Sequence, residues 1–199
     1  MREAYNRMAR ERDRSELQEW KIVERSRYLS KLQEEKRGRL LEIGAGTGRD
    51  SLFFQEAGLQ VTSADLSEEM VALCREKGLD ARVMDFYRLD FAEEAFEAVY
   101  ALNCLLHVPK KDLPDVLAEI RRILVPGGLF FMGVYGGVDS DGVWEKDTYE
   151  LKRYFSMYPD DDLTAVVKKV FEVEEFRTVS LGEGTPHFQS LILRRSRNE

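Results

Sequence analysis

The order of apolar and polar positions along the chain predicts alternating helices and strands. Residues 1–36 contain no Gly or Pro, and their apolar positions recur at intervals of three and four, which is typical of helices with one buried face. From residue 39 onward, short apolar runs alternate with segments of helical periodicity, and glycines stand at several of the junctions. Such alternation predicts a mainly parallel sheet with helices on both faces.

Individual elements follow from this pattern and from their capping residues. Ser67, followed by two acids, indicates a helix N-terminus, and Pro114 fits the first turn of a helix, where a missing N–H costs nothing. The fully apolar run that ends at Tyr135 is typical of a central strand. The predicted strands are 39–43, 59–64, 81–84, 96–102, 129–135, 171–180 and 187–195, and the helices after the first strand are 49–57, 67–77, 112–124 and 160–169.

The last two predicted strands are joined by only six residues, 181–186. Because a parallel crossover needs a dozen residues or more, these strands are expected to pair as an antiparallel hairpin. The sheet should therefore be mainly parallel with an antiparallel last strand. Residues 136–157 show neither the helical nor the strand repeat of apolar positions clearly and are predicted to be irregular.

The composition fits one folded domain. The chain has 199 residues, of which 43% are apolar and 34% are charged, so it can bury a core without disulfides or metals. No run approaches the length of a membrane span, and the N-terminus lacks an apolar signal core. Cys74 and Cys104 fall inside predicted elements, which favours free thiols in a reducing cytoplasm. Since paired Cys and His residues at metal-ligand spacing are absent from the sequence, no metal is expected.

The net charge of −7 is unevenly distributed. Residues 1–39 hold 12 Lys or Arg against 8 Asp or Glu, so the rest of the chain carries the acidic excess. An acidic body disfavours a large nucleic-acid surface. The basic N-terminal segment could contact an anionic substrate, but a solvated helix face is the favoured interpretation.

The first predicted strand ends in a glycine turn, Gly-Ala-Gly-Thr-Gly at 44–48, and a helix follows. Glycines let the backbone approach a ligand closely, and the free N–H groups of the helix start point at it. In a dinucleotide site the third glycine lies three residues after the second, but here Arg49 holds that position. The spacing therefore predicts a nucleotide-like ligand and disfavours an NAD-linked oxidoreductase.

In order along the chain, five stretches resemble motifs of the class I S-adenosylmethionine-dependent methyltransferases. Residues 40–50, with Glu42 before the glycines, resemble the first motif. Asp65 at the end of the second strand matches the acid that holds the ribose, and Asp85 followed by Phe86 matches the pair that contacts the adenine. Residues 102–109 are similar to the family's motif after the fourth strand, and residues 124–129 to its motif before the fifth strand.

This resemblance covers about residues 39–195 and implies a Rossmann-like, doubly wound α/β fold with S-adenosylmethionine as the cofactor. The chemistry of Asp65 agrees, because a carboxylate at a strand end can accept hydrogen bonds from both ribose hydroxyls. The cofactor-binding residues that the resemblance implies are Glu42, Gly44, Ala45, Gly46, Gly48, Asp65, Leu66, Asp85, Phe86 and Asn103.

Methyl transfer mainly requires alignment of the reactants, and a base is needed only if the acceptor must lose a proton. His107, which follows the fourth strand, is the candidate base or orienting group, and a purely structural histidine is the competing interpretation. Cys104 is interpreted as a packing residue, not as a nucleophile. For the acceptor, the predicted contacts are Tyr135, Trp144, Arg153 and Tyr154, with Arg153 facing a substrate carboxylate.

We therefore predict a single methyltransferase domain, 1–199, that acts on an oxygen or nitrogen of a small-molecule acceptor. Alternatives are an RNA methyltransferase and a non-catalytic module that binds S-adenosylmethionine and partners another chain. The protein is expected to be cytoplasmic, with no membrane partner, as a monomer or homodimer. The predicted parts are an N-terminal helical cap (1–38), a cofactor-binding core (39–135), a substrate-side insertion (136–158) and a C-terminal helix with a β-hairpin (159–199).

Overall fold

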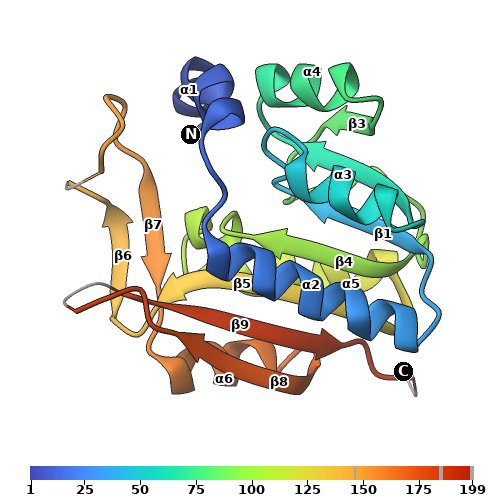
Figure 1. Cartoon of the computed structure of the whole chain (residues 1–199). Coiled ribbons are helices and arrows are strands. Elements are labelled where there is room, and N and C mark those ends of the chain that lie inside the picture. The colour runs from blue at the N-terminus through green and yellow to red at the C-terminus, as the bar shows by residue number, and fades with distance from the viewer. Residues whose placement is uncertain (146, 184–185, 198–199) are drawn as a thin grey trace.

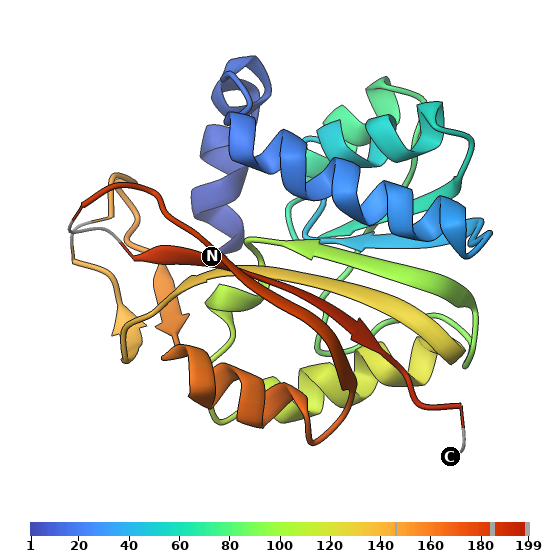
Figure 2. The same cartoon turned by 60° about the horizontal axis from the view of Figure 1, so that its bottom comes forward.

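The computed structural model describes residues 1–145, 147–183 and 186–197, which form a central sheet with helices on both faces (Figures 1 and 2). The strands are β1 (Arg39–Ile43), β2 (Gln60–Asp65), β3 (Asp80–Val83), β4 (Phe96–Leu102), β5 (Leu124–Gly136), β6 (Ser140–Val143), β7 (Tyr154–Met157), β8 (Glu172–Val179) and β9 (His187–Arg194). The helices are α1 (Arg2–Arg14), α2 (Glu19–Glu34), α3 (Arg49–Glu56), α4 (Glu68–Glu76), the 3-10 helix η1 (Leu105–His107), α5 (Leu113–Ile123) and α6 (Asp160–Val167).

Within the described residues, seven strands form the main sheet in the order β3-β2-β1-β4-β5-β9-β8. The first five run parallel, whereas β9 is antiparallel to both β5 and β8. The predicted fold class and the C-terminal hairpin are thus confirmed. Strand order reverses between β1 and β4, and at such a switch point the carboxyl ends of parallel strands leave a crevice for a ligand.

Alternate residues of the central strands face two different helix layers. Leu40 and Tyr100 pack with Tyr28 of α2 and Phe54 of α3, and the neighbouring residues Leu41 and Val99 pack on the opposite face with α5 and α6. Figure 2 shows α2 and α3 above the sheet and α5 and α6 below it. Burial on both faces explains why these strands are apolar throughout.

Local sequence signals placed most boundaries within a few residues. The hydroxyl of Ser67 accepts a hydrogen bond from the N–H of Met70, which confirms the predicted cap of α4. Strand β5, however, begins at Leu124, before the Pro-Gly-Gly turn. Phe96 pairs with Leu124 and Ala98 with Leu129, so the intervening turn is accommodated as an irregularity within the ladder.

The outer segments agree with the sequence in one part and differ from it in another. The N-terminal segment forms helices as expected, but the pattern is interrupted at residues 15–18, so α1 and α2 are separate helices that point in different directions (Figure 1). Residues 136–157 are not irregular throughout, because β6 and β7 pair antiparallel in a second, two-stranded sheet. Backbone pairing between β6 and β7 forms this small sheet. Each strand has only four residues, and residues 136–157 show little alternation of apolar and polar positions, so the sequence showed no sign of the pairing.

Candidate active site

The three glycines of the glycine turn differ in how much space surrounds them. A Cβ on Gly44 would lie 2.3 Å from the Cβ of Cys104, and one on Gly48 would lie 2.6 Å from Leu79 Cδ1. These two glycines therefore allow close packing of the protein against itself. Around Gly46, which has φ +55°, a Cβ would meet nothing within 4 Å. Gly46 is consequently the glycine that leaves room beside the turn.

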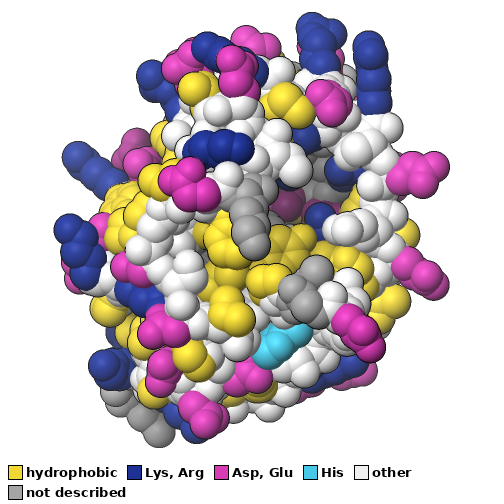
Figure 3. Space-filling view, turned by 90° about the vertical axis from the view of Figure 1, so that its left-hand side faces the viewer, with side chains coloured by type: hydrophobic (Ala, Val, Ile, Leu, Met, Phe, Trp, Pro, Cys, Tyr) yellow, Lys and Arg dark blue, Asp and Glu magenta, His cyan; other side chains and the backbone are white. Residues whose placement is uncertain are grey.

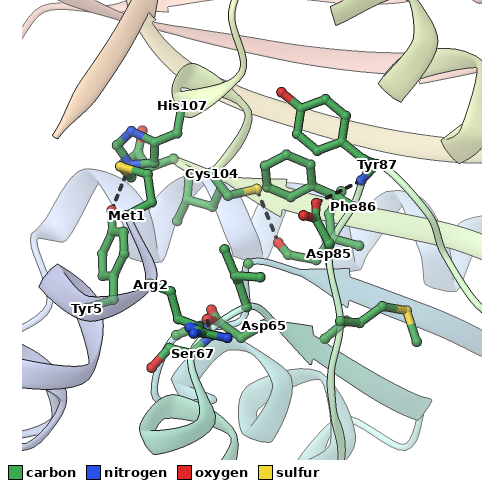
Figure 4. A pocket seen from close by; sticks show the side chains of 18 of the residues that line it. Met1, Arg2, Tyr5, Asp65, Ser67, Asp85, Phe86, Tyr87, Cys104 and His107 are labelled. Carbon is green, nitrogen blue, oxygen red and sulfur yellow. Dashed lines mark hydrogen bonds between the residues drawn. The ribbon is translucent and has the colours of Figure 1, made fainter. Parts of the chain in front are cut away.

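A first cavity of about 270 Å³ lies beside the glycine turn, at the carboxyl ends of the parallel strands (Figure 4). We call it the nucleoside cavity. Arg2 and Tyr5 of α1, together with Met1 just before this helix, contribute to its lining. From the predicted set, the cavity is lined by Gly44, Gly46, Asp65, Leu66, Asp85, Phe86 and Asn103.

Asp65 is the central polar group of the nucleoside cavity. Its carboxylate accepts hydrogen bonds from the N–H groups of Gly46 and Ser67, each at 2.8 Å. Burial raises the pKa of Asp65 above its usual range, although these two donors act in the opposite direction. Because a carboxylate has about four acceptor positions, two backbone donors leave capacity for further hydroxyl groups. Asp85 lies across the cavity and accepts from the N–H of Tyr87 at 3.0 Å.

Asn103 carries an unpaired polar atom. Its Oδ1 is buried and has no hydrogen-bond partner among the described residues, and its φ of +54° is in the left-handed region. Strained backbone and an unpaired buried acceptor both cost free energy, and such features concentrate at ligand sites. Asn103 follows β4 directly and lines the nucleoside cavity and the two cavities described next.

The remaining predicted cofactor residues lie behind the glycine turn. Glu42 and Ala45 line a small cavity of about 80 Å³ on that side, whereas Gly48 lines neither this cavity nor the nucleoside cavity. The Glu42 carboxylate is buried and accepts a hydrogen bond from the Ser51 hydroxyl. Burial, together with the charge of nearby Asp50, raises the pKa of Glu42 well above its usual range.

A second cavity, of about 410 Å³, lies next to the nucleoside cavity and contains three of the four predicted acceptor contacts, Tyr135, Trp144 and Arg153. We call it the acceptor cavity. The side chain of the fourth, Tyr154, is directed elsewhere, since its hydroxyl donates to Asp141 at 2.7 Å. Figure 3 views the end of the molecule that carries β6 and β7, where hydrophobic side chains gather beside a hollow with basic groups around it.

A polar network joins the two cavities. The Tyr5 hydroxyl lies 2.7 Å from Nε2 of His107 and accepts from Nη1 of Arg153 at 3.1 Å (Figure 4 shows the first contact). Arg153 also donates through Nε and Nη2 to the buried carboxylate of Asp147, at 2.8 and 2.7 Å. The Arg153 charge is thus already paired within the protein.

The hydrogen bonds of His107 fix its tautomer. Nδ1 lies 2.7 Å from the carbonyl oxygen of Tyr154, which can only accept, so Nδ1 carries the proton and Nε2 accepts from Tyr5. Burial lowers the pKa of His107 to about 4. The imidazole is therefore neutral at ordinary pH, and a group with so low a pKa is better suited to orient Tyr5 than to take up a proton.

Sequence reasoning missed the charged groups that α1 and α2 place in the site. Arg12 of α1 lines all three cavities, and Lys21 of α2 lines two of them. Asp147, between β6 and β7, was also missed and pairs with Arg153. Tyr5 lies in the predicted helical cap, and its contact with His107 left no sign in the sequence. The helical pattern gives the buried face of each helix but not where the helix docks, so no sequence signal identified these groups.

Comparisons with known proteins agree with this geometry. Residues 41–132 match the family model described as a methyltransferase domain. A sterol 24-C-methyltransferase from Gibberella zeae is 32% identical over 126 residues, which are 58% of this chain and 31% of that protein. The ubiquinone biosynthesis O-methyltransferase of Xanthomonas oryzae pv. oryzae is 35% identical over 101 residues, 47% of this chain and 41% of that protein. The chain thus spans less than half the length of these curated relatives.

Among solved structures, the fold resembles that of the 1,6-didemethyltoxoflavin-N1-methyltransferase of Burkholderia thailandensis, determined with 1,6-didemethyltoxoflavin and S-adenosylhomocysteine bound. The TM-score is 0.71 at 23% identity, covering 98% of this chain and 87% of that chain. In the part of the chain that the structure describes, no helix combines the length and apolar character needed to cross a membrane. The family match over residues 41–132, together with the sequence relatives, shows that the chain carries a methyltransferase domain of the class I S-adenosylmethionine-dependent type.

Proposed function

We propose that the protein transfers a methyl group from S-adenosylmethionine to an oxygen or nitrogen of a small-molecule acceptor bound in the acceptor cavity. One observation carries this proposal: the nucleoside and acceptor cavities share Tyr5, Arg12, Asn103 and His107 in their linings. Two molecules in these cavities would therefore meet at a common wall. Holding two reactants in contact is the main requirement for this reaction.

The residues of the nucleoside cavity fit the cofactor. Asp65 has acceptor capacity left for the ribose hydroxyls, and the open space at Gly46 allows close approach of a ligand. The unpaired Oδ1 of Asn103 offers an acceptor for a cationic or N–H group. Phe86 and Leu66 would flank the adenine ring, and the carboxyl group of Glu42 lies behind the turn, where it is held by the Ser51 hydroxyl. When bound, S-adenosylmethionine supplies a methyl group on a positively charged sulfur, which activates it for displacement.

Tyr5 and His107 would act at the shared wall of the two cavities. The neutral His107 holds the Tyr5 hydroxyl through Nε2, and its own Nδ1–H is anchored on the Tyr154 carbonyl. We assign His107 the role of orienting Tyr5, whose hydroxyl can hydrogen-bond to an acceptor heteroatom. Because Tyr5 belongs to α1, this helix would also exclude water from the reacting atoms.

The names of the relatives indicate the breadth of acceptors on this fold. They include a carbon, an oxygen and a nitrogen methyltransferase. An oxygen or nitrogen acceptor suits this chain because Tyr5 and Asn103 are hydrogen-bonding groups, which recognise a heteroatom better than a carbon.

Incubation of the purified protein with methyl-labelled S-adenosylmethionine and a panel of phenols, carboxylic acids and amines tests the proposal. We expect S-adenosylhomocysteine and labelled product with at least one acceptor, and loss of both in the Asp65→Ala variant. Cofactor binding without product from any acceptor would favour a non-catalytic binding module. No binding of S-adenosylhomocysteine would refute the proposal.

A further inference from the structure

The charge in the acceptor cavity differs from that of the protein as a whole. The chain has a net charge of −7. The described residues that line the acceptor cavity nevertheless include three cations, Arg12, Lys21 and Arg153, against one carboxylate, Asp147. Since His107 is neutral, this cavity is a region of positive charge in an acidic protein.

Within the described part of the chain, one of these three cations is neutralised by an ion pair. Arg153 is paired with Asp147, as described above. Arg12 instead donates through Nη1 to the Tyr149 hydroxyl at 3.0 Å, and the Lys21 ammonium lies 5.3 Å from the centre of the Trp20 ring. Among the described residues, neither Arg12 nor Lys21 forms an ion pair.

The positive charges of Arg12 and Lys21 repel each other. Burial lowers the pKa of Lys21, and the charge of Arg12 lowers it further, whereas Asp50 acts in the opposite direction. Two half-buried cations at the same cavity with uncharged partners raise the free energy of the protein, and an anion bound between them would relieve this repulsion. We propose that the acceptor carries a carboxylate or phosphate group that Arg12 and Lys21 bind.

The aromatic side chains that line the acceptor cavity indicate the shape of the rest of the acceptor. Tyr135, Trp144 and Phe155 line the cavity, and the last two rings are in contact with centroids 6.0 Å apart. These walls favour a flat apolar body. Together with the cations they specify an aromatic or otherwise flat organic acid and disfavour an uncharged acceptor.

Both cations also line the small cavity behind the glycine turn, where the carboxylate of the cofactor's methionine is a second possible anion. The guanidinium of Arg12 is held on the acceptor side, by Tyr149 and over the Tyr5 ring at 5.4 Å. Its charge counteracts the rise in pKa that burial causes at Tyr5 and Tyr135, which line the acceptor cavity, and also at Asp65 in the nucleoside cavity. The hydrogen bond to Tyr149 of the β6–β7 insertion therefore favours the acceptor as the source of the anion.

The inference rests on the proposed function, so its test begins with S-adenosylhomocysteine at saturation. Calorimetric titration then compares 1-naphthoate and 1-naphthyl phosphate with uncharged 1-naphthamide. At least one anion should bind about tenfold more tightly than the amide, the effect expected of one hydrogen bond to a charged group. Arg12→Gln with Lys21→Gln should reduce this preference to about twofold or less, and Arg10→Gln on the exposed face of α1 should preserve it.

A second titration separates the two sources of anion. Binding of S-adenosylhomocysteine is compared with that of 5′-methylthioadenosine, which lacks the amino-acid end, in the same variants. Weaker S-adenosylhomocysteine binding with an unchanged naphthoate preference would assign the cations to the cofactor and overturn the inference. Equal binding of the three probes, or none, to the wild-type protein would also overturn it. Failure of the wild-type protein to bind S-adenosylhomocysteine would instead refute the proposed function itself.

Discussion

The nucleoside cavity and the acceptor cavity are constructed in different ways. Around the nucleoside cavity, the polar groups belong to strand ends and turns that the sheet fixes, such as Gly46 and Asp65, which are hydrogen-bonded to each other. In the acceptor cavity, Tyr5, His107 and Arg153 come from three segments far apart in the sequence and are joined by side-chain hydrogen bonds. The first site depends on backbone geometry, and the second on how α1 and the β6–β7 insertion dock.

Gly46→Val should have the largest effect, because the added side chain would fill the space that a ligand needs. We expect no detectable binding of S-adenosylhomocysteine by calorimetry. Gly78→Val is the matched control, since Gly78 also has positive φ and open space but lies at the end of α4, away from the cavities. Both variants should lose about 1–2 kcal/mol of stability from left-handed strain. Normal binding by Gly46→Val would place the cofactor elsewhere.

His107 should make stability depend on pH. Its pKa is about 4 in the folded protein and about 6.5 when unfolded, so the unfolded chain binds the proton first. The free energy of unfolding should therefore fall by about 3 kcal/mol as pH drops from about 6.5 to about 4. Urea unfolding across this range should show a shallower dependence in His107→Gln, with His187→Gln as the control. An equal slope in wild type and His107→Gln would contradict the buried neutral imidazole.

Asp65→Ala should weaken binding of S-adenosylhomocysteine by about 2–3 kcal/mol, because the ribose hydroxyls lose a charged acceptor. Two backbone N–H groups also lose their partner, so urea unfolding must accompany the calorimetry. Asp80→Ala is the control, because it removes an exposed carboxylate at the start of β3, outside the cavity. Equal affinities for the Asp65 and Asp80 variants would remove Asp65 from the cofactor site.

Tyr5→Phe should have the smallest effect on the cofactor and separates the two cavities most clearly. It deletes the hydroxyl that joins His107 and Arg153, so stability should fall by about 1 kcal/mol. Affinity for S-adenosylhomocysteine should change less than about twofold, because the cofactor site rests mainly on backbone groups and Asp65. Tyr154→Phe removes a hydroxyl outside the cavities and is the control. A large loss of cofactor affinity in Tyr5→Phe would mean that the two cavities are not independent.

The same contrast explains what the sequence could predict. The positions of Asp65 and Asn103 follow from strand ends, and strand ends follow from apolar runs and turn residues, so these residues were found together with the fold. Ser67 and Pro114 marked helix starts through local hydrogen bonding and steric rules.

The acceptor side could not be predicted in this way. The pairing of Arg153 with Asp147, and of Tyr5 with His107, depends on the docking of segments separated by long stretches of chain. Arg12 and Lys21 belong to the basic N-terminal segment, for which the sequence favoured a solvated face over contact with an anionic substrate, and the structure places both side chains at the cavities. Gly44 lines the nucleoside cavity and also packs against Cys104, whereas Gly48 packs against Leu79 and lines neither the nucleoside cavity nor the small cavity behind the turn.

A crystal structure of the protein with S-adenosylhomocysteine tests the central claim most directly. We predict that the nucleoside lies in the cavity lined by Gly46, Asp65 and Phe86, with the ribose hydroxyls on the Asp65 carboxylate and the sulfur at the wall shared with the acceptor cavity. Density for the ligand elsewhere, or in this cavity without contact to Asp65, would contradict the account.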